Sequence, residues 1–169
     1  MYDLLDYAEA QTRSLVRTLP DGVYRFADYL DEDSAGGHPC RIALKLTIDG
    51  DGIEFDFTGS DPQLESSINM PTGGDPRHIL MMVGLDYVLY SLDPSILLNS
   101  GMTRVCHCIL PKGTIVNPEF PAAVGMRSLT EARVMDVIFG AFAQVLPERL
   151  PACPASGGPL MNVNSVDHR

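Results

Sequence analysis

Two stretches of alternating apolar and polar residues, joined by a glycine-rich turn, constrain the fold of this chain more than any other feature. Apolar side chains occupy every second position over residues 41–48 and again over residues 53–58, and residues 49–52 between them read Asp-Gly-Asp-Gly. Alternation with a period of two places the apolar side chains on one face of a strand. A short Asp-Gly turn is typical of a β-hairpin. The sequence therefore predicts a hairpin with one buried face.

The other periodic segments predict helices and further strands around this hairpin. Pro76 fits the first turn of a helix, and Ser128 with Glu131 has the spacing of a capping box at the start of another helix. The mixture favours an α+β fold, in which an antiparallel sheet packs with two or three helices in a single compact domain. We expect helices over residues 2–18, 76–92 and 129–146, and strands over residues 23–30, 103–110 and 114–116.

Charge is distributed unevenly along the 169 residues. Residues 1–65 hold 14 acidic and 5 basic side chains, whereas residues 66–169 hold 8 acidic and 7 basic ones. The acidic segment is either a solvated face or a surface that binds a basic partner, and the sequence does not separate these two interpretations. On this basis we divide residues 1–169 into an acidic lobe 1–65, a helix-rich lobe 66–150 and an irregular tail 151–169.

The charge and the apolar pattern exclude several classes of function. A net charge of −10 opposes binding to nucleic acid and to anionic membranes, and the absence of tryptophan argues against base stacking. The longest apolar segment, residues 79–89, is interrupted by Asp86 and is shorter than the roughly 20 residues that a membrane helix needs. No secretory signal follows Met1. We therefore expect a cytoplasmic protein with no membrane span and no nucleic-acid partner.

The cysteines predict buried thiols rather than a metal site. Cys106 and Cys108 share one face of the expected strand while His107 lies on the other face, so the three side chains cannot converge on one metal ion. Cys40 and Cys153 are isolated in the sequence. Small thiols on a core strand are therefore the favoured interpretation.

Polar residues in the loops are the remaining candidates for a site. Thr58 and Ser60 follow the hairpin, Asn69 and Asn99 lie in turns, and Arg127 precedes a helix whose free N–H groups can bind an anion. Turn chemistry is the plainer explanation for each of them, because Asn and Ser side chains bond to their own backbone. No phosphate-binding loop, nucleophile or metal-binding motif is identifiable.

Seven segments, taken in order, resemble the hydantoinase B/oxoprolinase family. Each segment is a weak signal alone, but together they extend over nearly all 169 residues. The first of them reads Leu-Pro-Asp-Gly-Val-Tyr-Arg-Phe-Ala-Asp-Tyr-Leu-Asp. The segments are residues 19–31, 56–63, 68–71, 98–101, 111–118, 121–124 and 140–141.

The resemblance implies an activity that is shared between subunits. The family includes the B-type subunits of N-methylhydantoinase, the corresponding half of 5-oxoprolinase, and the alpha subunits of acetone and acetophenone carboxylases. It implies an ATP-dependent hydrolase of cyclic amides, in which an A-type subunit handles ATP and an upstream region rich in His and Asp binds a divalent metal. Family members are much longer than this chain. The chain is either an internal fragment, which is an excised piece or a truncated gene product, or a family member reduced to a core. We favour the fragment, which would hold no metal and would be catalytically incomplete alone.

The same resemblance suggests where a substrate would bind. In this interpretation Thr58, Ser60, Asn69 and Arg127 line a cleft and bind a polar ring or an acyl oxygen, and no catalytic residue is assigned. Two alternatives stay open: a non-catalytic interaction module of the same complex, and a piece of a carboxylase-type subunit that acts on a ketone. Association into a homo-oligomer is also left open.

Overall fold

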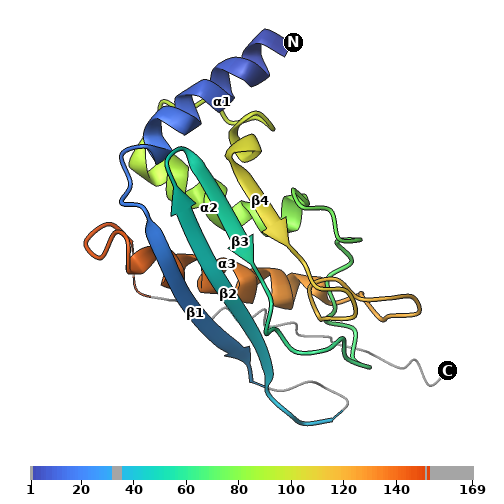
Figure 1. The fold of residues 1–169 in the computed structure, drawn as a ribbon. Coiled ribbons are helices and arrows are strands. Elements are labelled where there is room, and N and C mark those ends of the chain that lie inside the picture. The colour runs from blue at the N-terminus through green and yellow to red at the C-terminus, as the bar shows by residue number, and fades with distance from the viewer. Residues whose placement is uncertain (1, 32–35, 151, 153–169) are drawn as a thin grey trace, which may run out of the picture.

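A four-stranded sheet forms one layer of the protein (Figure 1). The computed structural model describes residues 2–31, 36–150 and 152. The strands lie side by side in chain order, with the first two pairs antiparallel and the last pair parallel. They are β1 (Gly22–Leu30), β2 (Cys40–Asp49), β3 (Gly52–Asp56) and β4 (Cys106–Ile109).

The predicted hairpin is present as β2 and β3. Ile48 pairs with Ile53 across the turn, and Gly50 in the turn has a φ of 58°, a conformation that favours glycine. The predicted strand over residues 23–30 is also present, as β1. The apolar side chains at alternate positions of the hairpin are buried, as the pattern predicts. They are Ile42, Leu44, Leu46, Ile48, Ile53 and Phe55.

The strand expected over residues 103–110 is shorter than predicted. It also runs parallel to its neighbour, whereas the expected sheet was antiparallel. A short 3-10 helix, η1 (Met102–Val105), occupies its first part, and only β4 joins the sheet. β4 pairs with β3 in parallel, so the sheet is mixed rather than antiparallel throughout. A parallel neighbour requires a long crossover connection, and residues 57–105 provide it.

The expected strand over residues 114–116 is wrong. Thr114 makes only isolated bridges, to Pro62 and to Asn117. The Asn117 amide donates to the carbonyl oxygen of Thr114 at 3.0 Å, which closes a tight turn. This turn ties the segment around Pro62 to the segment that precedes the last helix.

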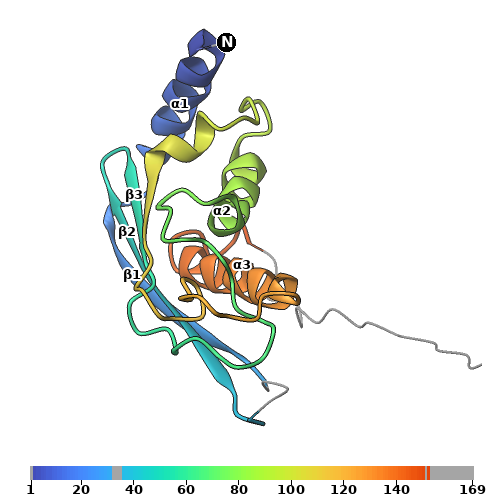
Figure 2. The same ribbon diagram turned by 90° about the vertical axis from the view of Figure 1, so that its right-hand side faces the viewer.

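Two helices cover one face of the sheet and a third lies at its end (Figure 2). α2 (Ile79–Leu92) and α3 (Arg127–Ala143) lie on the face that carries the buried apolar side chains. α1 (Tyr2–Val16) lies beyond the end of the strands and contacts η1. The predicted α+β class is therefore confirmed, as are the three helices in outline.

The predicted helix starts differ from those observed. Pro76 lies three residues before α2, whose first turn is capped by the side chain of His78. The predicted capping box is wrong, because Ser128 lies inside α3, and Met126 at the cap position makes no side-chain cap bond. The Met126 amide instead donates to the carbonyl oxygen of Ser67 at 2.8 Å. A tertiary contact thus determines where α3 begins.

One hydrophobic core connects the sheet with the helices. It contains residues from both segments 1–65 and 66–150, and Phe55 packs edge-on against Phe57 and Phe142. The division of the chain at residues 65 and 150 stays a prediction, and nearly all of the expected tail lies outside the described residues. Among residues 2–31, 36–150 and 152, no helix has both the length and the apolar character needed to cross a membrane.

The predicted buried thiols of Cys106 and Cys108 are confirmed, and Cys40 is buried as well. Cys40, Cys106 and Cys108 are free and buried, while His107 is exposed on the opposite face of β4. Burial raises the pKa of the Cys106 thiol well above its usual value, which keeps it protonated and unreactive. Cys153 lies outside the described residues.

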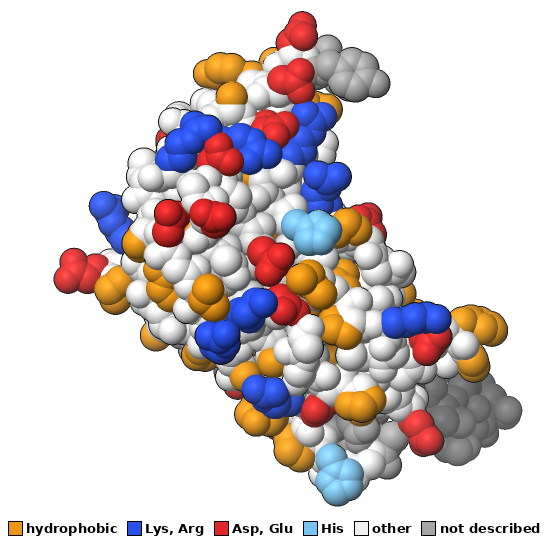
Figure 3. All heavy atoms as spheres, in the orientation of Figure 1, with side chains coloured by type: hydrophobic (Ala, Val, Ile, Leu, Met, Phe, Trp, Pro, Cys, Tyr) orange, Lys and Arg blue, Asp and Glu red, His pale blue; other side chains and the backbone are white. Residues whose placement is uncertain are grey.

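The face of the sheet that turns away from the helices carries acidic, basic and apolar side chains intermixed (Figure 3). The Lys45 ammonium group lies 2.9 Å from the Asp56 carboxylate and 3.8 Å from Glu54. Val23 and Tyr29 of β1 are exposed on the same face. No single sign of charge dominates this surface, so it offers no extended site for a polyanion.

Candidate functional site

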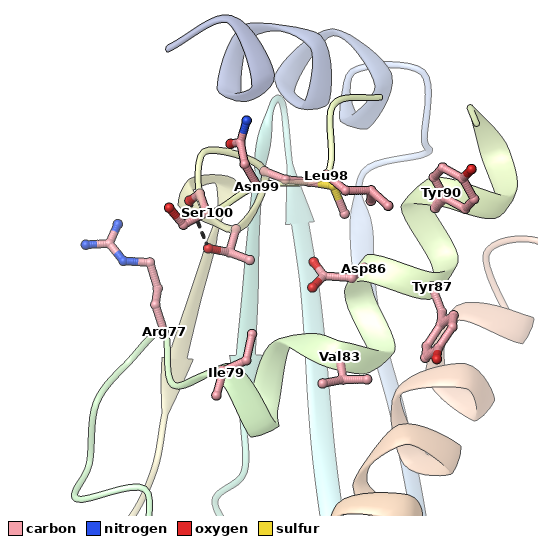
Figure 4. Close-up of a pocket in the computed structure, with 11 residues that line it drawn as sticks. Arg77, Ile79, Val83, Asp86, Tyr87, Tyr90, Leu98, Asn99 and Ser100 are labelled. Carbon is pink, nitrogen blue, oxygen red and sulfur yellow. Dashed lines mark hydrogen bonds between the residues drawn. The ribbon is translucent and has the colours of Figure 1, made fainter. Parts of the chain in front are cut away.

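A groove of about 690 Å³ lies between α2 and the loop formed by residues 97–103, and we call it the α2 groove (Figure 4). The loop on its second side includes the Leu-Asn-Ser-Gly segment 98–101. The residues that line the groove are Arg77, Ile79, Val83, Asp86, Tyr87, Tyr90, Leu98, Asn99, Ser100, Met102 and Thr103.

α2 carries apolar side chains on two sides, one that faces the core and one that lines the groove. Ile79, Val83, Asp86, Tyr87 and Tyr90 recur at intervals of three and four residues and therefore share one face of the helix. Ile79 is 62% exposed and Tyr87 is 58% exposed. A helix that is hydrophobic all round is normally covered all round. The exposed apolar side of α2 is thus unusual for a complete soluble domain, and it indicates a surface that another molecule or another part of a longer protein covers. The opposite side faces the core through Met81, Met82, Leu85, Val88 and Leu89.

The loop over residues 97–103 is held in place by α1. The Asn99 side chain accepts a hydrogen bond from the Gly101 amide (2.8 Å) and donates one to the Leu4 carbonyl oxygen (3.3 Å). Gly101 is packed so closely that an added Cβ would overlap the carbonyl group of Leu5. Because the loop is fixed to a helix, the α2 groove is a preformed feature.

Two ion pairs close to this loop hold α1 in the same arrangement. The Arg104 guanidinium lies 2.8 Å from the Asp6 carboxylate and 3.1 Å from that of Glu9. Glu9 also pairs with Arg13 at 2.8 Å, and Arg13 reaches Asp51 in the hairpin turn at 2.9 Å. Some of the excess acidic charge of residues 1–65 therefore joins α1 to the rest of the structure.

Asp86 is the one carboxylic acid in the lining of the groove. Its side chain points from α2 toward the loop that carries Leu98 (Figure 4). The Oδ1 atom is buried and has no hydrogen-bond partner among the described residues. Burial raises the pKa of Asp86 to about 6, because an apolar environment disfavours the charged form. The groove therefore combines an apolar surface with one carboxylate that lacks a partner.

Replacing Asp86 with Asn should stabilise the protein near neutral pH but hardly at pH 4. The folded-state pKa of about 6 lies above the ordinary value of 3.8. Below about pH 4 Asp86 is protonated in both the folded and the unfolded chain, and it does not reduce the free energy of unfolding. As the pH rises through 6 the folded protein must bury the charged carboxylate, and the free energy of unfolding falls. Because this group is only half buried, we allow for solvent screening and expect Asp86→Asn to raise the free energy of unfolding by about 1 kcal/mol at pH 7.5. Urea denaturation at both pH values measures the difference, and an equal effect at the two would contradict the argument.

The structure places Thr58 and Ser60 in different environments although they are two residues apart. Thr58 is exposed, and its amide donates to the Asp56 carboxylate at 2.9 Å. It borders a second depression, of about 470 Å³, on the outer face of the sheet. Ser60 is buried, and its hydroxyl bonds to the backbone amide and carbonyl groups of Ala43. Thr58 can meet a ligand directly, whereas Ser60 joins this loop to β2.

Asn69 and Arg127 also differ in burial, with Asn69 inside the protein and Arg127 on its surface. Asn69 is fully buried, and its amide group bonds to the backbone of Leu64, Ser66 and Ala123. Arg127 is exposed at the first position of α3, and its guanidinium donates to the Val124 carbonyl oxygen at 3.4 Å. The loop around Asn69 and the start of α3 are adjacent, so these two residues lie in one region.

The four predicted residues are therefore not gathered in one groove. Thr58 borders the depression on the sheet, and none of the four lines the α2 groove. Their role in binding a substrate stays a prediction. Sequence reasoning missed Asp86 as a candidate, although the signal was present: a single carboxylate interrupting the apolar segment 79–89.

Neither a phosphate-binding loop nor a group of three metal ligands is found among the described residues. Gly73 and Gly74 turn the chain with positive φ beside Asn117, and the Asp-Pro-Arg that follows them lacks the Lys and hydroxyl residue of a phosphate-binding loop. No three His, Cys, Asp or Glu side chains in the described part of the chain are grouped as metal ligands. Gly157 and Gly158 lie outside the described residues.

Comparison with solved structures supports the fold. The ATP-dependent caprolactamase from Pseudomonas jessenii matches with a TM-score of 0.71 and 27% sequence identity. The match covers 88% of this chain and 25% of the caprolactamase chain. The same layered arrangement of sheet and helices therefore occurs inside a larger enzyme.

Comparison with protein families and known sequences identifies the relationship. A provisionally named B-type subunit of a D-/L-hydantoinase, from Pseudomonas sp. (strain NS671), is 35% identical over 159 residues, which are 89% of this chain and 26% of that protein. The 5-oxoprolinase of Dictyostelium discoideum is 33% identical over 147 residues, which are 83% of this chain and 10% of that protein. The chain thus spans about a quarter or less of these relatives. The family model described as hydantoinase B/oxoprolinase matches residues 1–169, and the chain belongs to this family.

Proposed function

We propose that this chain is a section of the B-type subunit of an ATP-dependent enzyme that hydrolyses cyclic amides. The observation that carries the proposal is the family match over residues 1–169. It is supported by relatives named as a hydantoinase subunit, 5-oxoprolinases and a caprolactamase subunit. The hydantoins, 5-oxoproline and caprolactam to which these names refer are all cyclic amides, so we assign this substrate class to the assembly that contains the chain.

ATP and a divalent metal would be held elsewhere in that assembly. The described residues provide neither a phosphate-binding loop nor a cluster of metal ligands. We propose that ATP is bound by an A-type partner and that the metal is held outside this section. The contribution of this chain is then to position the substrate and to contact the other parts of the enzyme.

Within the chain, we propose Thr58 and Arg127 as the predicted residues that contact a substrate. Both are exposed, and each offers a hydrogen-bond donor suited to a ring carbonyl or an acyl oxygen. Ser60 and Asn69 would act through the loops that they hold, because their polar atoms already bond to the backbone. We assign no nucleophile and no general base.

A chimeric enzyme tests the proposal. The section of the caprolactamase beta chain that matches this protein would be replaced by residues 1–169, and the chimera would be purified with its natural partner. We expect ATP-dependent opening of the caprolactam ring, measured as ADP release and as formation of the ring-opened amino acid. A chimera that folds and assembles but shows no turnover would contradict the proposal. Turnover by the 169-residue chain alone would contradict its catalytic incompleteness.

Substitutions in the same chimera test the assigned contacts. Thr58→Ala and Arg127→Ala should each lower kcat/KM by about tenfold, which corresponds to the loss of one hydrogen bond to a reacting group. Glu65→Gln, a substitution at another loop position, is the matched control and should leave kcat/KM unchanged. Equal activity of all three variants would remove Thr58 and Arg127 from the site.

A further inference from the structure

We propose that the α2 groove is a binding site for an organic cation with an apolar body, an alkyl or aryl amine or amidine, whose charged group pairs with Asp86. This inference is independent of the cyclic-amide activity, because it rests on the groove itself. Neither the family relationship nor the predicted site residues assign a ligand to this groove.

The size and lining of the groove suit a small apolar molecule. Its volume of about 690 Å³ is within the range of small-molecule sites, which are mostly apolar and carry a few polar groups. Ile79, Tyr87 and Leu98 are 62%, 58% and 59% exposed. Exposed apolar side chains that line one groove are a common feature of sites that bind a ligand or a partner. Covering these three side chains would supply the favourable free energy of binding.

The carboxylate of Asp86 determines the polar part of the ligand. Its Oδ1 atom is buried without a hydrogen-bond partner among the described residues, although buried polar groups are almost always bonded. The Oδ1 atom itself has almost no accessible surface, but an ammonium or amidinium group in the groove would place a compensating charge beside the carboxylate. Tyr87 and Tyr90 also line the groove, and tyrosine rings attract cations through their faces.

The balance of charges in the groove favours a cation over an anion. Arg77 also lines the groove, but it is exposed and lies on the segment before α2, where water screens its charge. Asp86 is half buried among apolar side chains, so a charge that approaches it interacts more strongly. The net charge of −10 adds a weak general attraction for cations.

Three ligands with the same phenyl body test the charge preference. Phenethylamine, 2-phenylethanol and 3-phenylpropionate would be titrated into the 169-residue chain at pH 7.5, with affinities measured by calorimetry and the site located by NMR shift changes in α2 and the loop 97–103. We expect the amine to bind about tenfold more tightly than the alcohol, as one charge-assisted hydrogen bond allows. The propionate should bind most weakly. Equal affinities for amine and alcohol, a preference for the anion, or no binding in the α2 groove would each overturn the proposal.

A substitution of Asp86 tests whether this carboxylate causes the preference for the amine. Asp86→Asn should bring the ratio of amine to alcohol affinity close to one, and it is expected to fold because it removes an unfavourable buried charge. Glu65→Gln should keep the tenfold ratio. A ratio that persists in Asp86→Asn would show that another group selects the cation, and it would overturn the assignment.

Lowering the pH to 5 should remove the preference in the unmodified chain. The other titratable or charged groups that line the α2 groove are Arg77 on the preceding segment and Tyr87 and Tyr90 on α2, and Cys106 on β4 interacts with Asp86 from the core side. Arginine, tyrosine and cysteine ordinarily titrate above pH 8, so among these groups only Asp86 changes charge between pH 7.5 and 5. The amine stays protonated over this range. An undiminished preference at pH 5 would contradict the role of the carboxylate.

Discussion

Replacing Asn69 with Ala should lower the free energy of unfolding by about 3 kcal/mol. The Asn69 side chain accepts a hydrogen bond from the Leu64 amide at 2.8 Å and donates to the carbonyl oxygens of Leu64, Ser66 and Ala123 at 2.8, 3.0 and 2.9 Å. Alanine would leave these backbone groups inside the protein without partners. The loss exceeds that of a single hydrogen bond because several buried groups lose their partner at once.

Equilibrium urea denaturation of the 169-residue chain measures this effect. Arg127→Ala is the control, because Arg127 lies in the same region but is exposed, and its substitution should change stability by less than about 0.5 kcal/mol. If Asn69→Ala were as stable as the control, the hydrogen bonds of Asn69 would not be structural. The side chain would then be available for the substrate contact that the sequence suggests.

Gly101→Ala should also destabilise the protein strongly, by about 3 kcal/mol, because the added methyl group would overlap the Leu5 carbonyl group. Gly101 has an ordinary φ of −66°, so the cost arises from the contact with α1 and not from the backbone conformation. Relief of the overlap requires α1 to move, which would disturb the pairing of Arg104 with Asp6 and Glu9.

The expected signature of Gly101→Ala is local as well as global. Amide hydrogen exchange should accelerate throughout α1, while the amides of β2 and β3 keep their relative protection. Gly125→Ala is the matched control, since a Cβ there would have only an ordinary contact with Ser67 at 3.9 Å. Unchanged exchange in α1 would mean that the loop and the helix are not packed as described.

The parts of the fold that the sequence predicts are those governed by local interactions. The hairpin of β2 and β3 follows from alternation and from a turn whose glycine adopts a positive φ, and both features lie within one short stretch of the chain. The capping box of α3 was predicted wrongly, because the helix begins two residues earlier, where the Met126 amide bonds to the loop carbonyl of Ser67. The parallel pairing of β3 with β4 was missed because it depends on how the long crossover returns to the sheet.

The candidate site divides in a similar way. Thr58, Ser60, Asn69 and Arg127 attract attention because polar loop residues suggest function, but burial and hydrogen bonding are tertiary properties. In the structure Ser60 and Asn69 are buried and bonded to the backbone, and only Thr58 and Arg127 are exposed. Asp86 was visible only as an interruption in an apolar segment. Its place between α2 and the loop 97–103 arises from the packing of segments that are separated in the sequence.

By itself, the sequence determined the hairpin, the α+β class, the buried position of the strand thiols and, through its ordered segments, the family of the protein. These properties are encoded locally, in residue periodicity, in turn residues and in short motifs. The tertiary structure decided the mixed sheet, the clamping of the loop 97–103 by α1, and the environment of Asp86. Each of these depends on which distant residues come into contact, and only the packed chain sets whether a carboxylate finds a partner or is buried without one.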